Sequence, residues 1–417
     1  MLRLILGRAG TGKTALLFSE IAARCARRQS GSFLIVPEQY SHEAERELCA
    51  VCGDGLSLYA EVLSFTGLAR EISSECGGAA NEYLDKGGRL LCMALAADGL
   101  YSRLRVYGAA RRKAELQTML LGAVDEFKSA CVTGERLMQA SEACEGALGD
   151  KLHDLGLILE AYDGVVANGR ADPYDRLSVL AQQIGQCSMS ERTHVFVDGF
   201  TDFTAQERRV LEALLLKGVR LTVCLGCDEL HGGSEVFALS RITASALLKF
   251  AADNGVKAQT ERRDGESTKA KPLGEFCENM FSYRAVEAGD AQGRIKIISA
   301  ADTNAECEFA AAEAVSLVRD TGCRWRDIAV CAKGFDDYRL PLESAFSRFG
   351  APIYTARKAD MLSKPLPMLI ESAYEIILGG WEADDVFDYL RTGFGGLNTD
   401  ECDELENYVF MWQLHGE

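Results

Sequence analysis

Short apolar runs alternate with longer amphipathic stretches along the first 74 residues. The runs at 2–6, 33–36 and about 60–64 have the length and composition of buried strands. Each is followed by a stretch whose apolar residues recur three and four positions apart, as in a helix with one buried face. Strands that alternate with helices in this way predict an α/β fold built on a parallel sheet.

The pattern changes between residues 75 and 185, where long stretches with a 3.6-residue period show no strand-like alternation. This range predicts a helical insertion domain. Strand signals return at 193–200 and 219–227, with a helical stretch between them. The first lobe is therefore expected to comprise residues 1–74 and 186–253.

The remainder of the chain divides into two ranges. Residues 254–292 are polar and rich in lysine and glycine, which predicts a linker. Residues 293–417 are expected to form part of a second α/β lobe that runs into a helical segment. Its strands are predicted in "DIAVCAK" (327–333) and "APIYTAR" (351–357).

A glycine-rich segment joins the first predicted strand to the first predicted helix. It consists of Gly7, Arg8, Ala9, Gly10, Thr11, Gly12, Lys13 and Thr14. This is the pattern G-x-x-x-x-G-K-T of a phosphate-binding loop, and the strand before it and helix after it are the context that the motif requires. In such a loop backbone amides surround the phosphates, Lys13 reaches the outer phosphates, and the Thr14 hydroxyl binds magnesium. ATP and magnesium are the expected ligands.

Asp198 supplies a second magnesium ligand in this interpretation, because it follows the buried strand "VFV" at 195–197. In motor ATPases the next residue is normally a glutamate that polarises the attacking water. Here it is Gly199, which has no side chain to act as a base. Asp202 is the nearest alternative acid. The sequence thus predicts that ATP is bound but poorly hydrolysed, and it assigns no catalytic residue.

Composition narrows the class of protein. The 417 residues are 47% hydrophobic, enough for a sizeable core, and no apolar run approaches the roughly 18 residues of a membrane span. A cytoplasmic protein with no membrane partner is expected. The formal net charge of −17 argues against simple coating of nucleic acid, although it allows a local DNA track. The 15 cysteines lie mostly in apolar segments, as reduced buried thiols do.

Six segments together resemble a known family. They are "LILGRAGTGKT", "FLIVPEQYSHEAERE", "VLSFTGLA", "VFVDGFTDFTAQE", "DIAVCAK" and "DDVFDYLRTGFGGL…ELENYVF". Their order is similar to that in the B subunits of AddAB-type ATP-dependent helicase–deoxyribonucleases, also called RexB. The resemblance spans essentially the whole chain. Family members are far longer, so the chain is expected to represent about the N-terminal third.

The resemblance implies a fold and a role. The family is similar to UvrD-like superfamily 1 helicases, which implies a first RecA-like lobe with a helical insertion and the start of a second RecA-like lobe. It implies a degenerate motor that guides one DNA strand and scans for the recombination hotspot Chi during repair of double-strand ends. The implied partners are DNA ends, single-stranded DNA and an A-type subunit that supplies the translocating motor in a heterodimer. An iron–sulfur cluster is implied only for a C-terminal nuclease domain outside this chain.

The resemblance also carries individual residues. Asp198 and Gln206 match the helicase segment, which makes Gln206 a candidate sensor of water or the γ-phosphate, whereas Gly199 departs from it. Lys333 lies roughly where helicases carry an arginine, or else at a solvated strand end. No segment matches the glutamine-containing adenine contact, so base specificity is not implied. The candidate DNA contacts are Gln39, Tyr40, Ser64 and Phe65, with core packing as the alternative for Phe65.

Three alternatives stay open. The chain could belong to an active superfamily 1 helicase, against which Gly199 and the missing late arginine argue. It could be a scaffold with a vestigial loop, against which the intact Lys13, Thr14 and Asp198 argue. It could also be an unrelated P-loop kinase, but the helical insertion shows no sign of a small-substrate lid.

Overall fold

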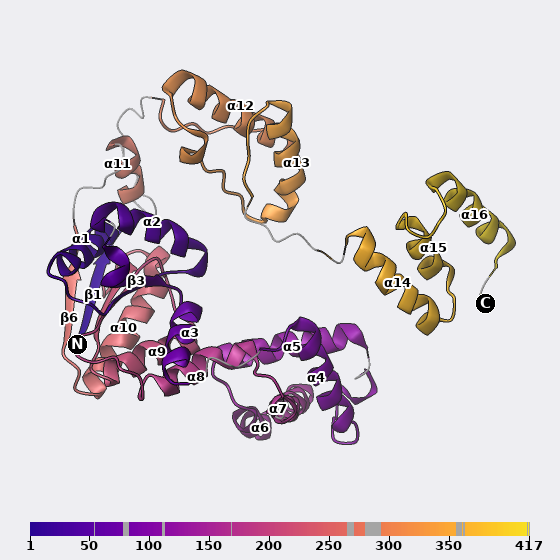
Figure 1. The fold of residues 1–417 in the computed structure, drawn as a ribbon, viewed down its shortest axis with the longest axis horizontal. Coiled ribbons are helices and arrows are strands. Elements are labelled where there is room, and N and C mark those ends of the chain that lie inside the picture. The colour runs from indigo at the N-terminus through magenta and orange to yellow at the C-terminus, as the bar shows by residue number, and fades with distance from the viewer. Residues whose placement is uncertain are drawn as a thin grey trace. The chain divides into compact units, whose positions relative to one another are not determined.

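The chain folds into two compact units, Met1–Lys296 and Ile297–Glu417 (Figure 1). The computed structural model describes residues 1–53, 55–77, 83–110, 113–167, 169–264, 271–279, 293–355, 361, 363–414 and 416. Among these residues no helix combines the length and the apolar character needed to cross a bilayer.

The first unit is built on a six-stranded sheet in which every pairing is parallel. The order of the strands across the sheet is β3-β2-β4-β5-β1-β6. They are β1 (Leu2–Gly7), β2 (Ser32–Ile35), β3 (Ala60–Leu63), β4 (His194–Val197), β5 (Arg220–Gly226) and β6 (Ala258–Arg262). The predicted α/β class with a parallel sheet is therefore confirmed.

Two buried clusters cover the two faces of this sheet. Because successive strand side chains point to opposite faces, Leu4 and Leu6 of β1 belong to one cluster and Ile5 to the other. The first cluster takes apolar side chains from α3 (Phe65–Glu75), α9 (Ala205–Leu216) and α10 (Ala238–Asp253). The second takes them from α1 (Lys13–Ala26) and α2 (Ser41–Cys52). The central strands are thus apolar on both faces, as parallel strands require.

The predicted helical insertion has a hydrophobic core of its own, which includes Met93, Ile158 and Tyr162. Its helices are α4 (Lys86–Gly99), α5 (Ala114–Ser129), α6 (Gly134–Glu142), α7 (Ala147–Val166) and α8 (Arg176–Gln183). The last of these differs from the others, because Leu180 of α8 is buried in the core of the sheet. Helix α8 packs on α3 and α9, so by packing it belongs to the sheet lobe rather than to the insertion.

Part of the range predicted as a linker, 254–292, forms structure. Residues 258–262 are strand β6, which pairs in parallel with β1 from Leu2 to Leu6. The sequence missed this strand because "AQTER" lies at the sheet edge, is largely exposed and carries no hydrophobic signal. Helix α11 (Lys271–Asn279) follows it, while 265–270 and 280–292 lie outside the described residues.

The second unit is helical over its described residues. It contains α12 (Thr303–Thr321), α13 (Phe335–Arg348), α14 (Pro365–Gly379), α15 (Ala383–Arg391) and α16 (Thr399–Trp412). The strands expected at 327–333 and 351–357 are not formed in the described part, which leaves out 356 and 357. Ile328 has extended backbone, but a segment becomes a strand only when a neighbouring strand takes its hydrogen bonds.

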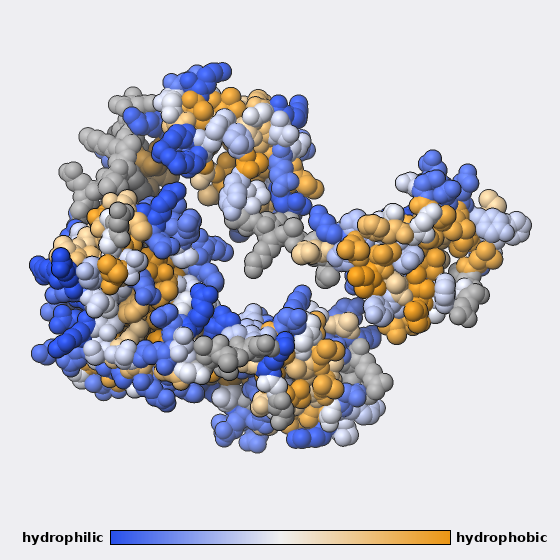
Figure 2. Space-filling model, in the orientation of Figure 1, coloured by the Kyte–Doolittle hydropathy of each residue, from blue (hydrophilic) through white to orange (hydrophobic). Residues whose placement is uncertain are grey.

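Apolar side chains gather on the surface of the C-terminal helices (Figure 2). On α14 the side chains of Ile370, Ile377 and Leu378 are exposed, the last to 79%. A contiguous apolar surface of this kind is typical of one that packs against another polypeptide.

The insertion contains a buried carboxylate whose charge is part of its stability. Asp154 on α7 accepts hydrogen bonds from the backbone amides of Arg105, Val106 and Tyr107 at 2.7–3.1 Å. Burial alone would raise the pKa of Asp154, but these amide hydrogen bonds outweigh it and lower the pKa below its ordinary value. The ionised carboxylate therefore stabilises the fold above the ordinary pKa, and this stabilisation is lost as the pH falls through the folded-state pKa.

We expect Asp154→Asn to lower the free energy of unfolding by about 2 kcal/mol at pH 7, because buried amides lose a charged acceptor. The difference from wild type should narrow at pH 3. Urea unfolding followed by circular dichroism at both pH values measures it. The control is Asp150→Asn, which removes an exposed partner of Arg105 and should cost below about 1 kcal/mol. A loss that is equal at both pH values would contradict this account of Asp154.

Candidate nucleotide-binding site

The phosphate-binding loop joins the end of β1 to the start of α1, as predicted. Gly10 and Gly12 have positive φ angles of 85° and 79°, which side chains other than glycine rarely adopt. Gly7 is required for a different reason: a Cβ there would lie 2.6 Å from Thr11 Oγ1 and 2.9 Å from the carbonyl oxygen of Arg263. The three glycines of the motif thus fit the backbone that they form.

The side chain of Lys13 folds back onto the backbone of this loop. Its Nζ donates hydrogen bonds to the carbonyl oxygens of Gly7 at 2.6 Å and Arg8 at 2.8 Å. Burial lowers the pKa of the Lys13 ammonium, and the nearby Cys224 and Asp198 only partly offset this. A half-buried ammonium whose partners are neutral carbonyls is a favourable position for an anion.

Thr14 and Asp198 meet although 184 positions separate them. The Thr14 hydroxyl donates a hydrogen bond to Oδ2 of Asp198 at 2.6 Å. Asp198 is buried at the tip of β4, and the carboxyl ends of parallel strands share one edge of the sheet. A hydroxyl and a carboxylate oxygen are ligands that magnesium takes beside phosphates. The pair that the sequence predicted as a magnesium site is therefore brought together.

These residues line a pocket of about 750 Å³, large enough for a nucleotide. Its polar and charged lining includes Lys13, Thr14 and Asp198. Its apolar lining includes Val236 and Phe237 from the connection between β5 and α10, and Leu239 from the first turn of α10. Gly199, Phe200 and Thr201 also line it.

Gly199 follows Asp198 in a conformation that favours glycine. Its φ is +83°, and a Cβ would lie 3.1 Å from Cδ of Pro37. Asp202, the alternative acid, is exposed and outside the pocket lining. Its Oδ1 accepts hydrogen bonds from the Phe203 amide and the Thr243 hydroxyl, both at 2.7 Å. The local structure thus engages Asp202 elsewhere.

Gln206 lies outside the described lining of this pocket. It is buried on α9, and its amide donates to the carbonyl oxygen of Tyr174 at 2.7 Å and the hydroxyl of Ser178 at 3.1 Å. Gln206 therefore joins α9 both to α8 and to the segment that leads into it. The sequence could not show this, because it requires the packing of α8 on the sheet lobe.

The four candidate DNA contacts follow β2 and β3 at the same edge of the sheet. Phe65 is 4% exposed and makes edge-on contacts with Phe200 and Phe203, so it is a core residue rather than a base-stacking one. Ser64 caps α3 by accepting a hydrogen bond from the Gly67 amide. Gln39 is exposed, and the Tyr40 hydroxyl is 3.2 Å from a carboxylate oxygen of Glu47. Burial and the nearby carboxylate raise the pKa of Tyr40 to about 12.

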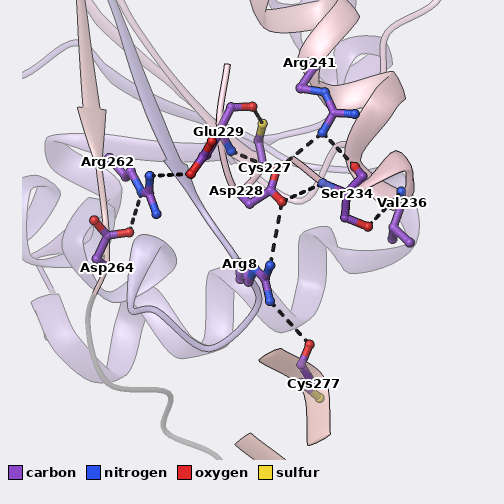
Figure 3. Close-up of polar contacts among 10 residues, drawn as sticks. All are labelled: Arg8, Cys227, Asp228, Glu229, Ser234, Val236, Arg241, Arg262, Asp264 and Cys277. Carbon is purple, nitrogen blue, oxygen red and sulfur yellow. Dashed lines mark hydrogen bonds and ion pairs between the residues drawn. The ribbon is translucent and has the colours of Figure 1, made fainter. Parts of the chain in front are cut away.

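Two further positions complete the comparison with the sequence. Lys333 is exposed and belongs to the second unit. Arg8 is not among the described residues that line the pocket, and its guanidinium lies 3.7 Å from Asp228, which follows β5 (Figure 3). Sequence reasoning missed Asp228, although an acid close to the end of a buried strand was a signal similar to the one that identified Asp198.

Comparison with known proteins identifies the family to which this chain belongs. A family model described as "ADDB, N-terminal" matches residues 4–274. The B subunits of the ATP-dependent helicase/deoxyribonucleases of Desulforudis audaxviator and Acetivibrio thermocellus are 34% and 31% identical to the whole chain. The B subunit from Heliobacterium modesticaldum is 34% identical. The chain covers 37%, 37% and 36% of the lengths of these relatives. The chain therefore belongs to the AddB family and matches its N-terminal part.

Proposed function

We propose that this chain is the helicase-like, nucleotide-holding part of a helicase–nuclease B subunit that processes double-strand DNA ends for recombinational repair. It binds ATP with magnesium and hydrolyses it poorly. The observation that carries this proposal is the Thr14–Asp198 hydrogen bond beside Gly199, which unites the magnesium-binding pair next to a position without a side chain.

Three features support binding. Lys13 lies within the phosphate loop with only carbonyl partners for its charge in the loop. The amino end of α1 adds partial positive charge at the same place. Thr14 and Asp198 together would hold the magnesium ion that accompanies the phosphates. A loop that had lost its function would have no reason to keep all of these groups, which argues against the vestigial scaffold.

The acidic side chain and two of the hydroxyls that line the pocket are already engaged in other contacts, which argues against efficient hydrolysis of ATP. Hydrolysis requires a group that orients the attacking water. Asp198 is the one acidic side chain among the described residues that line the pocket, and Thr14 already engages it. The Ser240 hydroxyl donates to the carbonyl oxygen of Thr201 at 3.0 Å. The described lining thus offers no second carboxylate for the water, which disfavours the active-motor alternative.

The relatives supply the rest of the proposal, because each is named as one subunit of an ATP-dependent helicase/deoxyribonuclease. Such a subunit has a partner, and we assign to it an A-type helicase–nuclease subunit that provides the translocating motor. The substrate class is DNA ends, with single-strand guidance and Chi scanning as the roles of the helicase-like part. We also assign a cytoplasmic location, because the proposed processing of DNA ends takes place on the chromosome. We assign the nuclease and an iron–sulfur cluster to the part of such subunits that this chain does not match.

Equilibrium binding of fluorescently labelled ATP with magnesium tests the proposal directly. We expect Lys13→Ala to weaken binding by about 2 kcal/mol or more, because a charge-assisted phosphate contact is lost. Lys249→Ala, which removes an exposed lysine of α10, is the control for the change in charge and should leave the affinity unchanged. Binding that is equally strong in the Lys13 variant would refute nucleotide binding at this loop.

Restoring an acid after Asp198 should not restore turnover. We expect Gly199→Glu to release phosphate no faster than wild type and to lower the free energy of unfolding by about 1–3 kcal/mol, because the positive φ and Pro37 exclude a side chain. Gly226→Ala is the matched control, since Gly226 lines the same pocket and a Cβ added there would meet no atom within 4 Å. Phosphate release that rises tenfold or more in the Gly199 variant would show that only the missing carboxylate limits hydrolysis.

A further inference from the structure

Asp228 is the centre of a polar cluster beside the phosphate loop (Figure 3). It is buried two residues after the end of β5, and its carboxylate accepts hydrogen bonds from the amides of Glu229 at 2.8 Å and Ser234 at 3.0 Å. Two guanidinium groups approach the same carboxylate, Arg8 at 3.7 Å and Arg241 at 3.4 Å. The carboxylate thereby connects the phosphate loop to the β5–α10 connection, which contributes Val236 and Phe237 to the pocket lining.

Arg8 is fixed at both its side chain and its backbone. The guanidinium lies beside Asp228 and 5.6 Å from the ring centre of Phe237. The carbonyl oxygen of Arg8 accepts hydrogen bonds from Lys13 Nζ at 2.8 Å and from the Thr11 hydroxyl at 2.9 Å. The ion pair with Asp228 therefore restrains Arg8, the residue whose carbonyl oxygen accepts the hydrogen bond from Lys13.

The guanidinium of Arg8 also reaches helix α11. It donates a hydrogen bond to the carbonyl oxygen of Cys277 at 3.4 Å, near the C-terminal end of this nine-residue helix. A cation at that end satisfies carbonyl groups that have no partner within the helix and interacts favourably with its dipole. Helices this short are marginal alone, so a contact of this kind contributes to the order of α11.

We propose that Asp228 and Arg8 are positioning residues for nucleotide binding. Their ion pair holds the start of the phosphate loop in its binding conformation and, through Arg8, caps α11, so the order of the loop and the order of α11 depend on the same contact. Arg8 is outside the described pocket lining and acts through its backbone rather than as a phosphate ligand. This inference rests on the proposed binding of ATP at the loop.

Positioning can be distinguished from a simple effect of charge. Arg8→Gln removes a positive charge near the phosphates and should weaken binding on either account. Asp228→Asn removes a negative charge, so an effect through the electric field alone would strengthen binding. Loss of positioning would weaken it. The two accounts therefore predict opposite results for Asp228→Asn.

The first measurement is the affinity of each variant for labelled ATP with magnesium. We expect Arg8→Gln and Asp228→Asn each to weaken binding about fivefold, the scale of one partly exposed charge pair. The double variant should bind ATP no more weakly than the single variant with the lower affinity, because both substitutions break the same Arg8–Asp228 contact. Unchanged or tighter binding by Asp228→Asn, or additive losses in the double variant, would overturn the proposal.

Two control variants distinguish the effect of the Arg8–Asp228 pair from the effects of neighbouring guanidinium groups. Arg262→Gln removes a neighbouring guanidinium that pairs with Glu229 and Asp264 instead of Asp228 (Figure 3). Arg241→Gln leaves the Arg8–Asp228 pair in place and tests the β5–α10 connection alone. Both should bind ATP within twofold of wild type. A fivefold loss in Arg241→Gln would move the effect from the loop to the connection and overturn the assignment to Arg8.

Hydrogen–deuterium exchange of residues 271–279 without nucleotide tests the tether to α11 independently. We expect exchange at least fivefold faster in Arg8→Gln than in wild type, the scale of one lost cap, and no change in Arg262→Gln. Equal exchange in Arg8→Gln and wild type would overturn the tether. If wild type bound no ATP, the proposed function and the positioning role would both fail, while the exchange result would still decide the contact with α11.

Discussion

The parallel direction of the strands is the constraint on which the site depends. It brings the carboxyl ends of β1 and β4 to one edge of the sheet, where the Thr14 hydroxyl meets Asp198 across 184 positions of sequence. The same edge receives the chain after β5, which places Asp228 beside Arg8. An antiparallel arrangement would send alternate connections to the opposite edge and separate these pairs. The apolar strands that bury the two cores thus also fix the geometry of the polar groups.

At this edge the groups that would hold a nucleotide are present, whereas the described pocket lining has no second carboxylate that would orient water for hydrolysis. In the proposed site Lys13 would bind phosphates and Thr14 and Asp198 would bind magnesium, and all three line the pocket. The next position along the chain, Gly199, has a left-handed backbone conformation in contact range of Pro37, so the absence of a carboxylate is part of the local fold. A protein that holds ATP beside a partner with the motor is consistent with this division.

The sequence predicted the features that depend on local pattern. The phosphate loop, Asp198 and the parallel sheet follow from apolar runs and short motifs, and the structure has them where expected. The features that it missed depend on packing. Strand β6 is polar because it lies at an exposed edge, and Gln206 turns toward Tyr174 only because α8 packs on the sheet lobe. The sequence left core packing and base stacking open for Phe65, and the contacts with Phe200 and Phe203 make it a core residue.

The central claim is that this site keeps ATP intact, and a single-turnover experiment tests it most directly. The protein, in excess over γ-labelled ATP with magnesium, is incubated for many times the dissociation time of the complex, and the bound nucleotide is then separated from free phosphate. The account predicts that the bound nucleotide is recovered almost entirely as ATP, because no second carboxylate in the described lining orients water at the γ-phosphate. Recovery mainly as ADP with labelled phosphate, abolished by Lys13→Ala, would contradict it.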